Sequence, residues 1–224
     1  MKVSVVIPAY NEEKCIESCL RSILNQSVAA DEIIVVDNNS TDNTVSIAQS
    51  FPITVIHEKD QGTIPTRNRG FNRAKFDIIA RTDADTEVPY TWIAQIKIYM
   101  SQNNCDAVLG TLYYKGAPAI INAPLYTGFV EYFNKFFGVY PLFGPNMAIS
   151  RKIWKKVKSR LCNDAAEVHE DIDLALHIKK IGGTVCFDRK NITRTSTRRL
   201  IHNPQSFFLE YPQRLLKMKQ THLS

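Results

Sequence analysis

Two acidic residues, one position apart, follow a short apolar segment in the first half of the chain. Asp83 and Asp85 come directly after residues 78–82 (IIART), whose apolar character predicts a buried strand. Carboxylates at a strand end can hold Mg²⁺ or Mn²⁺, because these ions prefer oxygen ligands and readily add phosphate oxygens. A solvated turn is the alternative explanation of such a DxD triplet, but its position after a strand favours a metal site.

A second group of acids opens a predicted helix at residues 170–181. Glu167, Glu170, Asp171 and Asp173 place four acids within seven residues. The helix dipole and the free N–H groups favour acids at a helix start, so a structural role accounts for them. Their crowding would also raise one pKa toward the range that a general base needs. Both interpretations remain open from the residues alone.

A third group is basic and lies near the end of the chain. Arg194, Arg198 and Arg199, with Ser196 and Thr197 between them, offer guanidinium and hydroxyl donors of the kind that bind phosphate. A solvated basic tail is the alternative. We therefore treat the three arginines as candidates for contact with a diphosphate or an acceptor.

The cysteines indicate no metal or disulfide framework. There are five, at positions 15, 19, 105, 162 and 186, and none forms a CxxC pair. An odd number without pairing predicts buried thiols in a reducing compartment.

The elements that must position these groups alternate between strands and helices. Apolar runs predict strands at 3–7, 33–36, 53–56, 78–80, 107–109, 147–149 and 185–187. Helical patterns lie at 16–24, with Asn11 as a cap, and at 40–49, 66–74, 92–100, 152–157 and 170–181, the last ended by Gly182. This order predicts an α/β fold with a largely parallel sheet, whose ligands bind beyond the carboxyl ends of the strands. Polar clusters at 9–12, 37–42 and 83–85 fall at such ends.

Residues 113–145 are rich in aromatic side chains. They predict an amphipathic helix with loops, or a surface that contacts something apolar, and packing into the core is the commoner explanation.

The composition is that of an ordinary globular protein with one large domain. Of the 224 residues, 44% are hydrophobic and 22% charged. No apolar run approaches the roughly 20 residues that span a bilayer, and the first apolar stretch is too short for a signal peptide, so we expect a cytoplasmic protein.

Charge divides the chain into two unlike halves. Residues 1–112 carry 10 Lys/Arg and 14 Asp/Glu, whereas residues 113–224 carry 18 and 8. The acidic half suits a metal ion, and the basic half suits phosphates, nucleic acid or an anionic membrane.

Taken in order, these segments resemble glycosyltransferase family 2, whose members are inverting enzymes with the GT-A fold. The matching segments are residues 3–12 (VSVVIPAYNE), 33–42 (IIVVDNNSTD), 66–70 (TRNRG), 83–85 (DAD), 144–148 (GPNMA) and 170–174 (EDIDL). Each motif is weak singly, and six in this order are specific. The resemblance implies one continuous domain with a mixed, mostly parallel sheet flanked by helices. Residues 1–112 would bind the nucleotide-sugar, and residues 113–224 would form the acceptor side with a basic tail.

The resemblance also implies roles for most of these motifs. The nucleotide-sugar would contact Pro8, Ala9, Tyr10, Glu12, Asp37, Asn38, Arg67, Asp83, Ala84 and Asp85. Asp83 would lie on the ribose side, and Asp85 would hold the metal that bridges to the diphosphate. Asp171, with Glu170 beside it, would deprotonate the acceptor hydroxyl. Many relatives have two successive acids where this chain has Asp37-Asn38, so the choice of nucleotide stays open.

The expected activity is a metal-dependent, inverting transfer of a sugar from a nucleoside-diphosphate sugar, and the expected donor is a UDP-sugar. The acceptor would be a hydroxyl or phosphate of a glycan or lipid-linked molecule in surface glycan or glycolipid synthesis. Mg²⁺ or Mn²⁺ would be the cofactor. Attachment to an anionic membrane at its inner face is a further expectation, and nucleic acid is not an expected partner.

Two other functions are consistent with parts of the sequence. A nucleotidyltransferase would carry a Gly-rich loop with Lys or Arg after the first strand, where this chain has residues 8–12 (PAYNE). A nucleic-acid-binding module is suggested by the pI of about 9.0 and would bind in a strongly salt-dependent way without Asp83 or Asp85.

Overall fold

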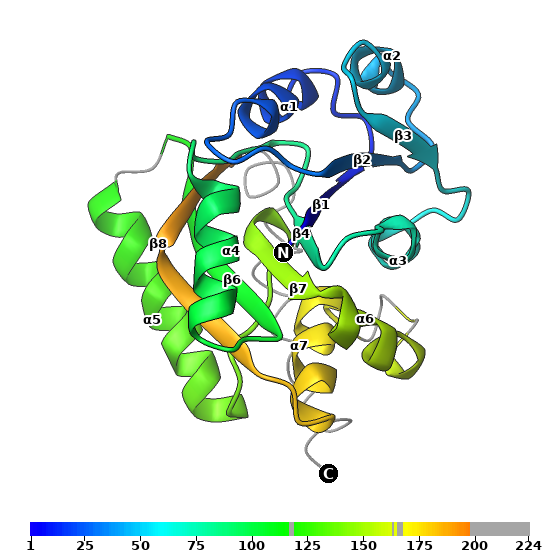
Figure 1. Cartoon of the computed structure of the whole chain (residues 1–224). Coiled ribbons are helices and arrows are strands. Elements are labelled where there is room, and N and C mark those ends of the chain that lie inside the picture. The colour runs from blue at the N-terminus through cyan, green and yellow to red at the C-terminus, as the bar shows by residue number, and fades with distance from the viewer. Residues whose placement is uncertain (117–118, 163, 165–167, 198–224) are drawn as a thin grey trace.

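The computed structural model describes residues 1–116, 119–162, 164 and 168–197. Eight strands form one sheet in the order β3-β2-β1-β4-β7-β6-β8-β5 (Figure 1). The strands are β1 (Val3–Ala9), β2 (Glu32–Asp37), β3 (Thr54–His57), β4 (Ile78–Arg81), β5 (Thr86–Glu87), β6 (Ala107–Tyr114), β7 (Met147–Ser150) and β8 (Val185–Thr195). The helices are α1 (Ile16–Leu24), α2 (Thr44–Gln49), α3 (Thr63–Arg73), α4 (Trp92–Gln102), α5 (Ala119–Phe137), α6 (Arg151–Val157) and α7 (Glu170–Lys180), with 3₁₀ turns η1 (Gly144–Asn146) and η2 (Lys158–Arg160).

Strands β3, β2, β1 and β4 are parallel and form the predicted first half of the sheet. Alternate residues of β1 enter the two cores on opposite faces, since Val5 and Ile7 pack in one cluster and Val6 in the other. Helices α1, α2 and α4 cover the first face, and α3, α5, α6 and α7 cover the second. An apolar strand buried on both faces is typical of a parallel sheet between helical layers, which confirms the predicted fold class.

The second half of the chain completes the same sheet. Strand β7 pairs antiparallel with both β4 and β6, and β6 pairs in parallel with β8. The sheet therefore crosses from residues 1–112 to residues 113–224 without a break between domains. Strand β8 extends to Thr195, although the sequence predicted a strand that ends at 187. Its polar residues pair with β6 up to Tyr114, a partner that local hydrophobicity could not indicate.

The prediction that all five cysteines are thiols is wrong. Cys105 and Cys186 form a disulfide with a Cα–Cα distance of 6.1 Å, across 81 positions of sequence. Both lie where β6 and β8 begin side by side, because Ala107 pairs with Val185. Cys15, Cys19 and Cys162 are outside any disulfide. The pairing depends on strand adjacency, and spacing along the chain could not reveal it.

The end of α7 follows its predicted signal, whereas several helix starts differ from the prediction: α2 begins at Thr44 and not at 40, and α3 begins at Thr63 and not at 66. Gly182 has φ +76°, as expected of a glycine that ends α7. Asn11, in contrast, does not cap α1, which begins five residues later at Ile16. Among the described residues, no helix combines the length and apolar character that crossing a bilayer requires.

Candidate active site

The turns after β1 and β2 lie side by side at the carboxyl edge of the sheet. The side-chain oxygen of Asn11 accepts from Thr41 N–H at 2.8 Å, and Asn11 N–H donates to Ser40 Oγ at 3.0 Å. These two bonds explain why Asn11 takes a left-handed conformation, φ 52°, instead of capping α1. The predicted residues Pro8, Ala9, Tyr10 and Glu12 all belong to this end of β1, with Tyr10 half exposed and Glu12 buried.

Asp37 ends β2 and lies against the neighbouring strand. Its carboxylate accepts from Ser40 N–H at 3.2 Å and lies 3.1 Å from His57 Nδ1. The next residue, Asn38, uses its amide on backbone: Nδ2 donates to the carbonyls of Glu58 and Asp60, and Oδ1 accepts from Gly62 N–H. Asn38 thus holds the segment that leads into α3. Its contact with a nucleotide base remains a prediction.

Asp83 and Asp85 lie at the carboxyl end of β4, as the sequence predicted. Asp85 is buried, and its Oδ1 accepts from the hydroxyls of Thr86 and Thr195, each at 3.3 Å. Thr195 comes from the end of β8, so the longer β8 supplies part of this site. Ala84 between the two acids is 3% exposed, which holds the turn against the core.

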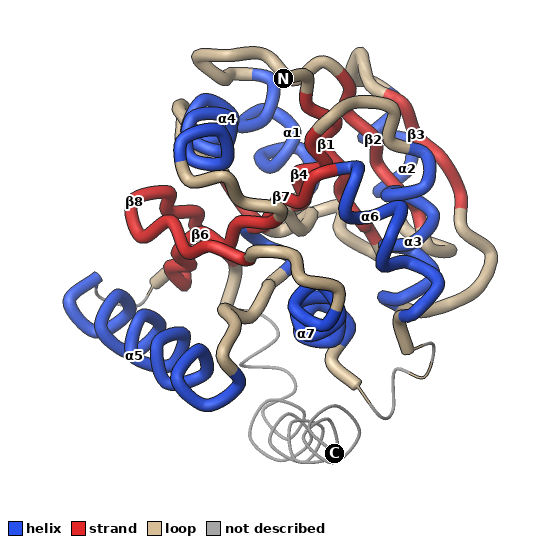
Figure 2. Tube along the Cα trace, turned by 60° about the horizontal axis from the view of Figure 1, so that its bottom comes forward, coloured by secondary structure: helices blue, strands red, loops and turns tan. Residues whose placement is uncertain are grey.

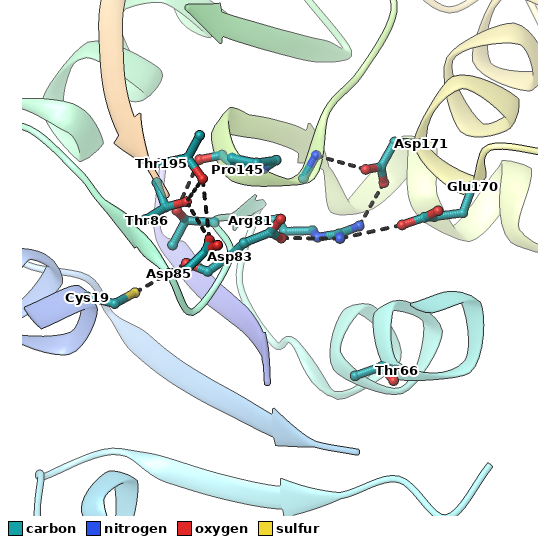
Figure 3. A network of polar contacts seen from close by, with 12 residues as sticks. Cys19, Thr66, Arg81, Asp83, Asp85, Thr86, Pro145, Glu170, Asp171 and Thr195 are labelled. Carbon is teal, nitrogen blue, oxygen red and sulfur yellow. Dashed lines mark hydrogen bonds and ion pairs between the residues drawn. The ribbon is translucent and has the colours of Figure 1, made fainter. Parts of the chain in front are cut away.

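A buried arginine that the sequence analysis did not single out connects the two acidic motifs. Arg81 Nη1 donates to Asp171 Oδ1 at 2.7 Å, and Nη2 lies 3.3 Å from Asp83 Oδ1 and 3.6 Å from Glu170 Oε1 (Figure 3). Burial alone would lower its pKa, but Asp171, Asp83 and Glu170 together raise it, so Arg81 stays charged. The available signal was a charged residue directly after the apolar residues 78–80.

Asp171 is held from two sides at the start of α7. Besides Arg81, the N–H of Gly144 donates to its Oδ2 at 2.8 Å. Burial raises the pKa of Asp171 to about 7, with Arg81 opposing and Glu170 adding to the rise. A buried carboxyl group with a pKa near neutrality has the protonation behaviour of a general base.

Glu170, the neighbour of Asp171, behaves in the opposite way. Burial opposes its ionisation, yet the charges of His169, Arg81 and Arg67 lower its pKa to about 2. The pair therefore consists of one carboxylate that stays ionised and one that titrates near neutral pH. Such a separation of two adjacent acids is how environments assign different roles to them.

The turn that contains Gly144 is fixed by Asn146. Its Nδ2 donates to the carbonyls of Thr111 and Asn191, and its Oδ1 accepts from Trp92 Nε1 at 2.8 Å. At Gly144 a Cβ atom would lie 2.5 Å from Arg81 Nη2, so only glycine fits here. Residues 144–148 belong to the family resemblance, which implied no role for them. In the structure they present a backbone N–H donor to Asp171.

The predicted arginines lie in different places. Arg67 is fully buried on α3, where Nη1 donates to the carbonyl of Glu170 at 2.6 Å and the guanidinium lies over the Trp154 ring. Its contact with a phosphate remains a prediction. Arg194 lies on β8 opposite Glu87 and Tyr113, and its contact with a diphosphate or an acceptor remains a prediction. Strand pairing extends further than the basic composition indicated. Arg198 and Arg199 lie outside the described residues.

The chain that gathers these carboxylates around one arginine is similar to known proteins. Residues 4–158, more than half of the chain, match the sequence profile described as glycosyl transferase family 2. The chain belongs to this family. This family 2 glycosyltransferase is 36% identical over 132 residues to the dolichol-phosphate mannosyltransferase of Pyrococcus furiosus, a match that covers 56% of this chain and 37% of the relative.

Solved structures confirm the GT-A fold. The mannosyltransferase PcManGT of Pyrobaculum calidifontis, in complex with GDP-Man and Mn²⁺, superposes with a TM-score of 0.75 at 21% identity, covering 99% of this chain and 64% of that one. Glucosyl-3-phosphoglycerate synthase of Mycobacterium tuberculosis, with Mn²⁺, UDP-Glc and phosphoglyceric acid, gives 0.67 at 20% identity, covering 98% and 79%. The chain spans only 32% of the uncharacterized glycosyltransferase YibD of Escherichia coli, to which it is 38% identical over 110 residues and 47% of its own length.

Proposed function

We propose that this glycosyltransferase moves a sugar from a nucleoside-diphosphate sugar to a hydroxyl or phosphate acceptor, with inversion at the anomeric carbon. The proposed donor is a UDP-sugar. The observation that carries the proposal is the buried cluster in which Arg81 joins Asp83 of the donor motif to Asp171 of the acceptor motif. It would place a titrating carboxylate beside the donor's diphosphate end. The acceptor would belong to surface glycan or glycolipid synthesis.

In this mechanism Asp171 accepts the proton of the acceptor hydroxyl while that oxygen attacks the anomeric carbon from the face opposite the leaving group. Arg81 and the Gly144 N–H fix the carboxylate's orientation from two sides. Arg81 also carries the positive charge that Asp171 needs as a partner while it is ionised. General-base assistance of this kind contributes typically about 10²–10⁴-fold in rate.

A divalent cation, Mg²⁺ or Mn²⁺, is part of the proposal. Within the described part of the chain, no group of three or more His, Cys, Asp or Glu side chains is arranged so that it could hold a metal ion by itself. The donor set still fits a cation that shares its ligand shell with substrate, because Asp83 and Asp85 offer hard carboxylate oxygens at one strand end. Asp85 would hold it, with Asp83 beside it, and the ion would neutralise charge on the leaving diphosphate. Two fold neighbours contain Mn²⁺ and a nucleotide-sugar, which supports this assignment.

The test is a transfer and hydrolysis assay with UDP-, GDP- and dTDP-sugars, each with Mn²⁺, Mg²⁺ and chelator. We expect one nucleotide to be released in a metal-dependent way, and proton NMR of the product to show the anomeric configuration opposite to that of the donor. Release that is equal with chelator and with Mn²⁺ would contradict the metal assignment. A product that retains the donor's configuration would contradict direct attack.

A further inference from the structure

Helix α5 exposes large apolar side chains along one face. Leu125 and Tyr132 are 69% and 68% exposed, and Phe129 and Phe136 are 38% and 47% exposed. Their spacing of four, three and four positions places them on one side of the helix, and we call them the α5 stripe. Val130, Phe133 and Phe137 face the core instead. The aromatic segment of the sequence therefore divides between core packing and an exposed surface.

Two members of the α5 stripe are in contact with each other. The rings of Tyr132 and Phe136 stack with centroids 6.3 Å apart and an interplanar angle of 15°. Single exposed apolar residues are ordinary on protein surfaces, but four large ones gathered on one side of a helix mark an interaction surface. Figure 2 shows α5 on the outside of the molecule, separated from α4 by β6 and β8.

Basic side chains border the stripe. Residues 119–137 contain only two charged residues, Glu131 and Lys135, and Glu131 is ion-paired with Arg189. At the end of the helix, Lys179 Nζ donates to the carbonyl of Phe137 at 2.6 Å. The stripe is thus flanked by Lys135, Lys179 and the Arg189–Glu131 ion pair, so its border carries a net positive charge. An aromatic face with Lys and Arg beside it is the pattern of helices that lie in a membrane interface.

The positive charge beside the stripe distinguishes among three possible occupants: a second copy of the chain, residues 198–224, and an anionic bilayer. A second copy of the chain would bring the same basic border against itself. Residues 198–224 carry five Lys/Arg and one Glu, so this segment is positively charged and would also be repelled by the basic side chains beside the stripe. A stable protein interface moreover takes about 20–30 residues from each partner, whereas an interfacial helix needs only such a stripe. An anionic bilayer supplies both an apolar phase and the opposite charge.

We propose that the α5 stripe is the docking surface for an anionic phospholipid membrane. Leu125, Phe129 and Tyr132 enter the interface, and Lys135 and Lys179 contact lipid phosphates. The start of α5 lies near the active site, because Asn122 Nδ2 donates to the carbonyl of Tyr114, which pairs with Thr195 beside Asp85. A docked enzyme would therefore present this end of its site to the bilayer. Lipid binding needs no sugar donor, so it is measured independently of transfer.

The experiment is co-sedimentation of the full chain with phosphatidylcholine vesicles, with and without phosphatidylglycerol. We expect binding to the anionic vesicles that weakens at high salt, and far weaker binding to the neutral ones. The double variant Leu125→Ser with Tyr132→Ser should lower the partition coefficient at least about tenfold. Its matched control is Tyr90→Ser with Ile98→Ser, which removes an aromatic and an aliphatic side chain that are also more than half exposed, and this control should bind like the unchanged protein.

Two further measurements separate the outcomes. Lys135→Glu should weaken binding to anionic vesicles without changing binding to neutral ones, and thermal melting should show that the exposed-site variants remain folded. Equal binding to both vesicle types, or equal loss in the stripe and control variants, would overturn the proposal. A dimer in light scattering that the stripe variant converts to monomer, without vesicle binding, would overturn it in favour of a second copy.

Discussion

Replacing Asp171 by Asn tests the proposed general base with little change in shape. The carboxylate now accepts one bond from Arg81 and one from Gly144, and an amide with a single acceptor oxygen can keep only one of them. We expect the variant to fold and to bind the donor with a similar KM. Its kcat should fall about 10²–10⁴-fold, the usual contribution of a general base.

The pH dependence of the unchanged enzyme supplies the quantitative part of the test. Burial raises the pKa of Asp171 to about 7, and the base acts only when ionised, so kcat/KM should rise with pH and level off above about 7. One unit below that pKa only about a tenth of the base is ionised. At pH 6 the rate should therefore be about a tenth of the plateau, and the Asn variant should lack this limb.

Glu170→Gln is the matched control, because it makes the same chemical change one residue away. The negative charge of Glu170 contributes to the raised pKa of Asp171. Removing that charge should move the acid limb to lower pH and leave more activity than Asp171→Asn does. The reasoning is refuted by any of three results: an Asp171→Asn variant within tenfold of the unchanged enzyme, a limb centred near pH 4, or an alkaline shift in Glu170→Gln.

Three other changes have defined outcomes. Asp85→Asn should abolish metal-stimulated transfer in a Mn²⁺ titration while the melting temperature stays unchanged, since an amide oxygen can still accept the two threonine hydroxyls; unaltered metal dependence would remove Asp85 from the site. Gly144→Ala should lower the free energy of unfolding in urea by about 1–3 kcal/mol, because its Cβ meets Arg81 at 2.5 Å. Cys105→Ser should lower the free energy of unfolding by about 4 kcal/mol under oxidising conditions, because it removes the disulfide to Cys186 across 81 positions of sequence. If the variant is less stable than the unchanged protein by a similar amount in excess reductant, packing and not the disulfide is responsible.

The sequence by itself determined the features that depend on near neighbours along the chain. An apolar strand followed by Asp83 and Asp85, and a helix that opens with Glu170 and Asp171 and ends before Gly182, are local patterns. They result from side-chain periodicity, capping and the preference of glycine for positive φ, each set within a few residues. The order of these patterns also identified the family, and hence the fold class, without any knowledge of long-range contacts.

Only the tertiary structure decided how those pieces combine. Arg81 and Asp171 are 90 positions apart, and they meet because β7 inserts antiparallel beside β4 and places Gly144 against both. The raised pKa of Asp171 follows from that burial, which no local pattern reports. The Cys105–Cys186 link likewise required β6 and β8 to lie side by side. Burial, charge pairing and strand adjacency join residues through space, so they arise only once the chain has folded.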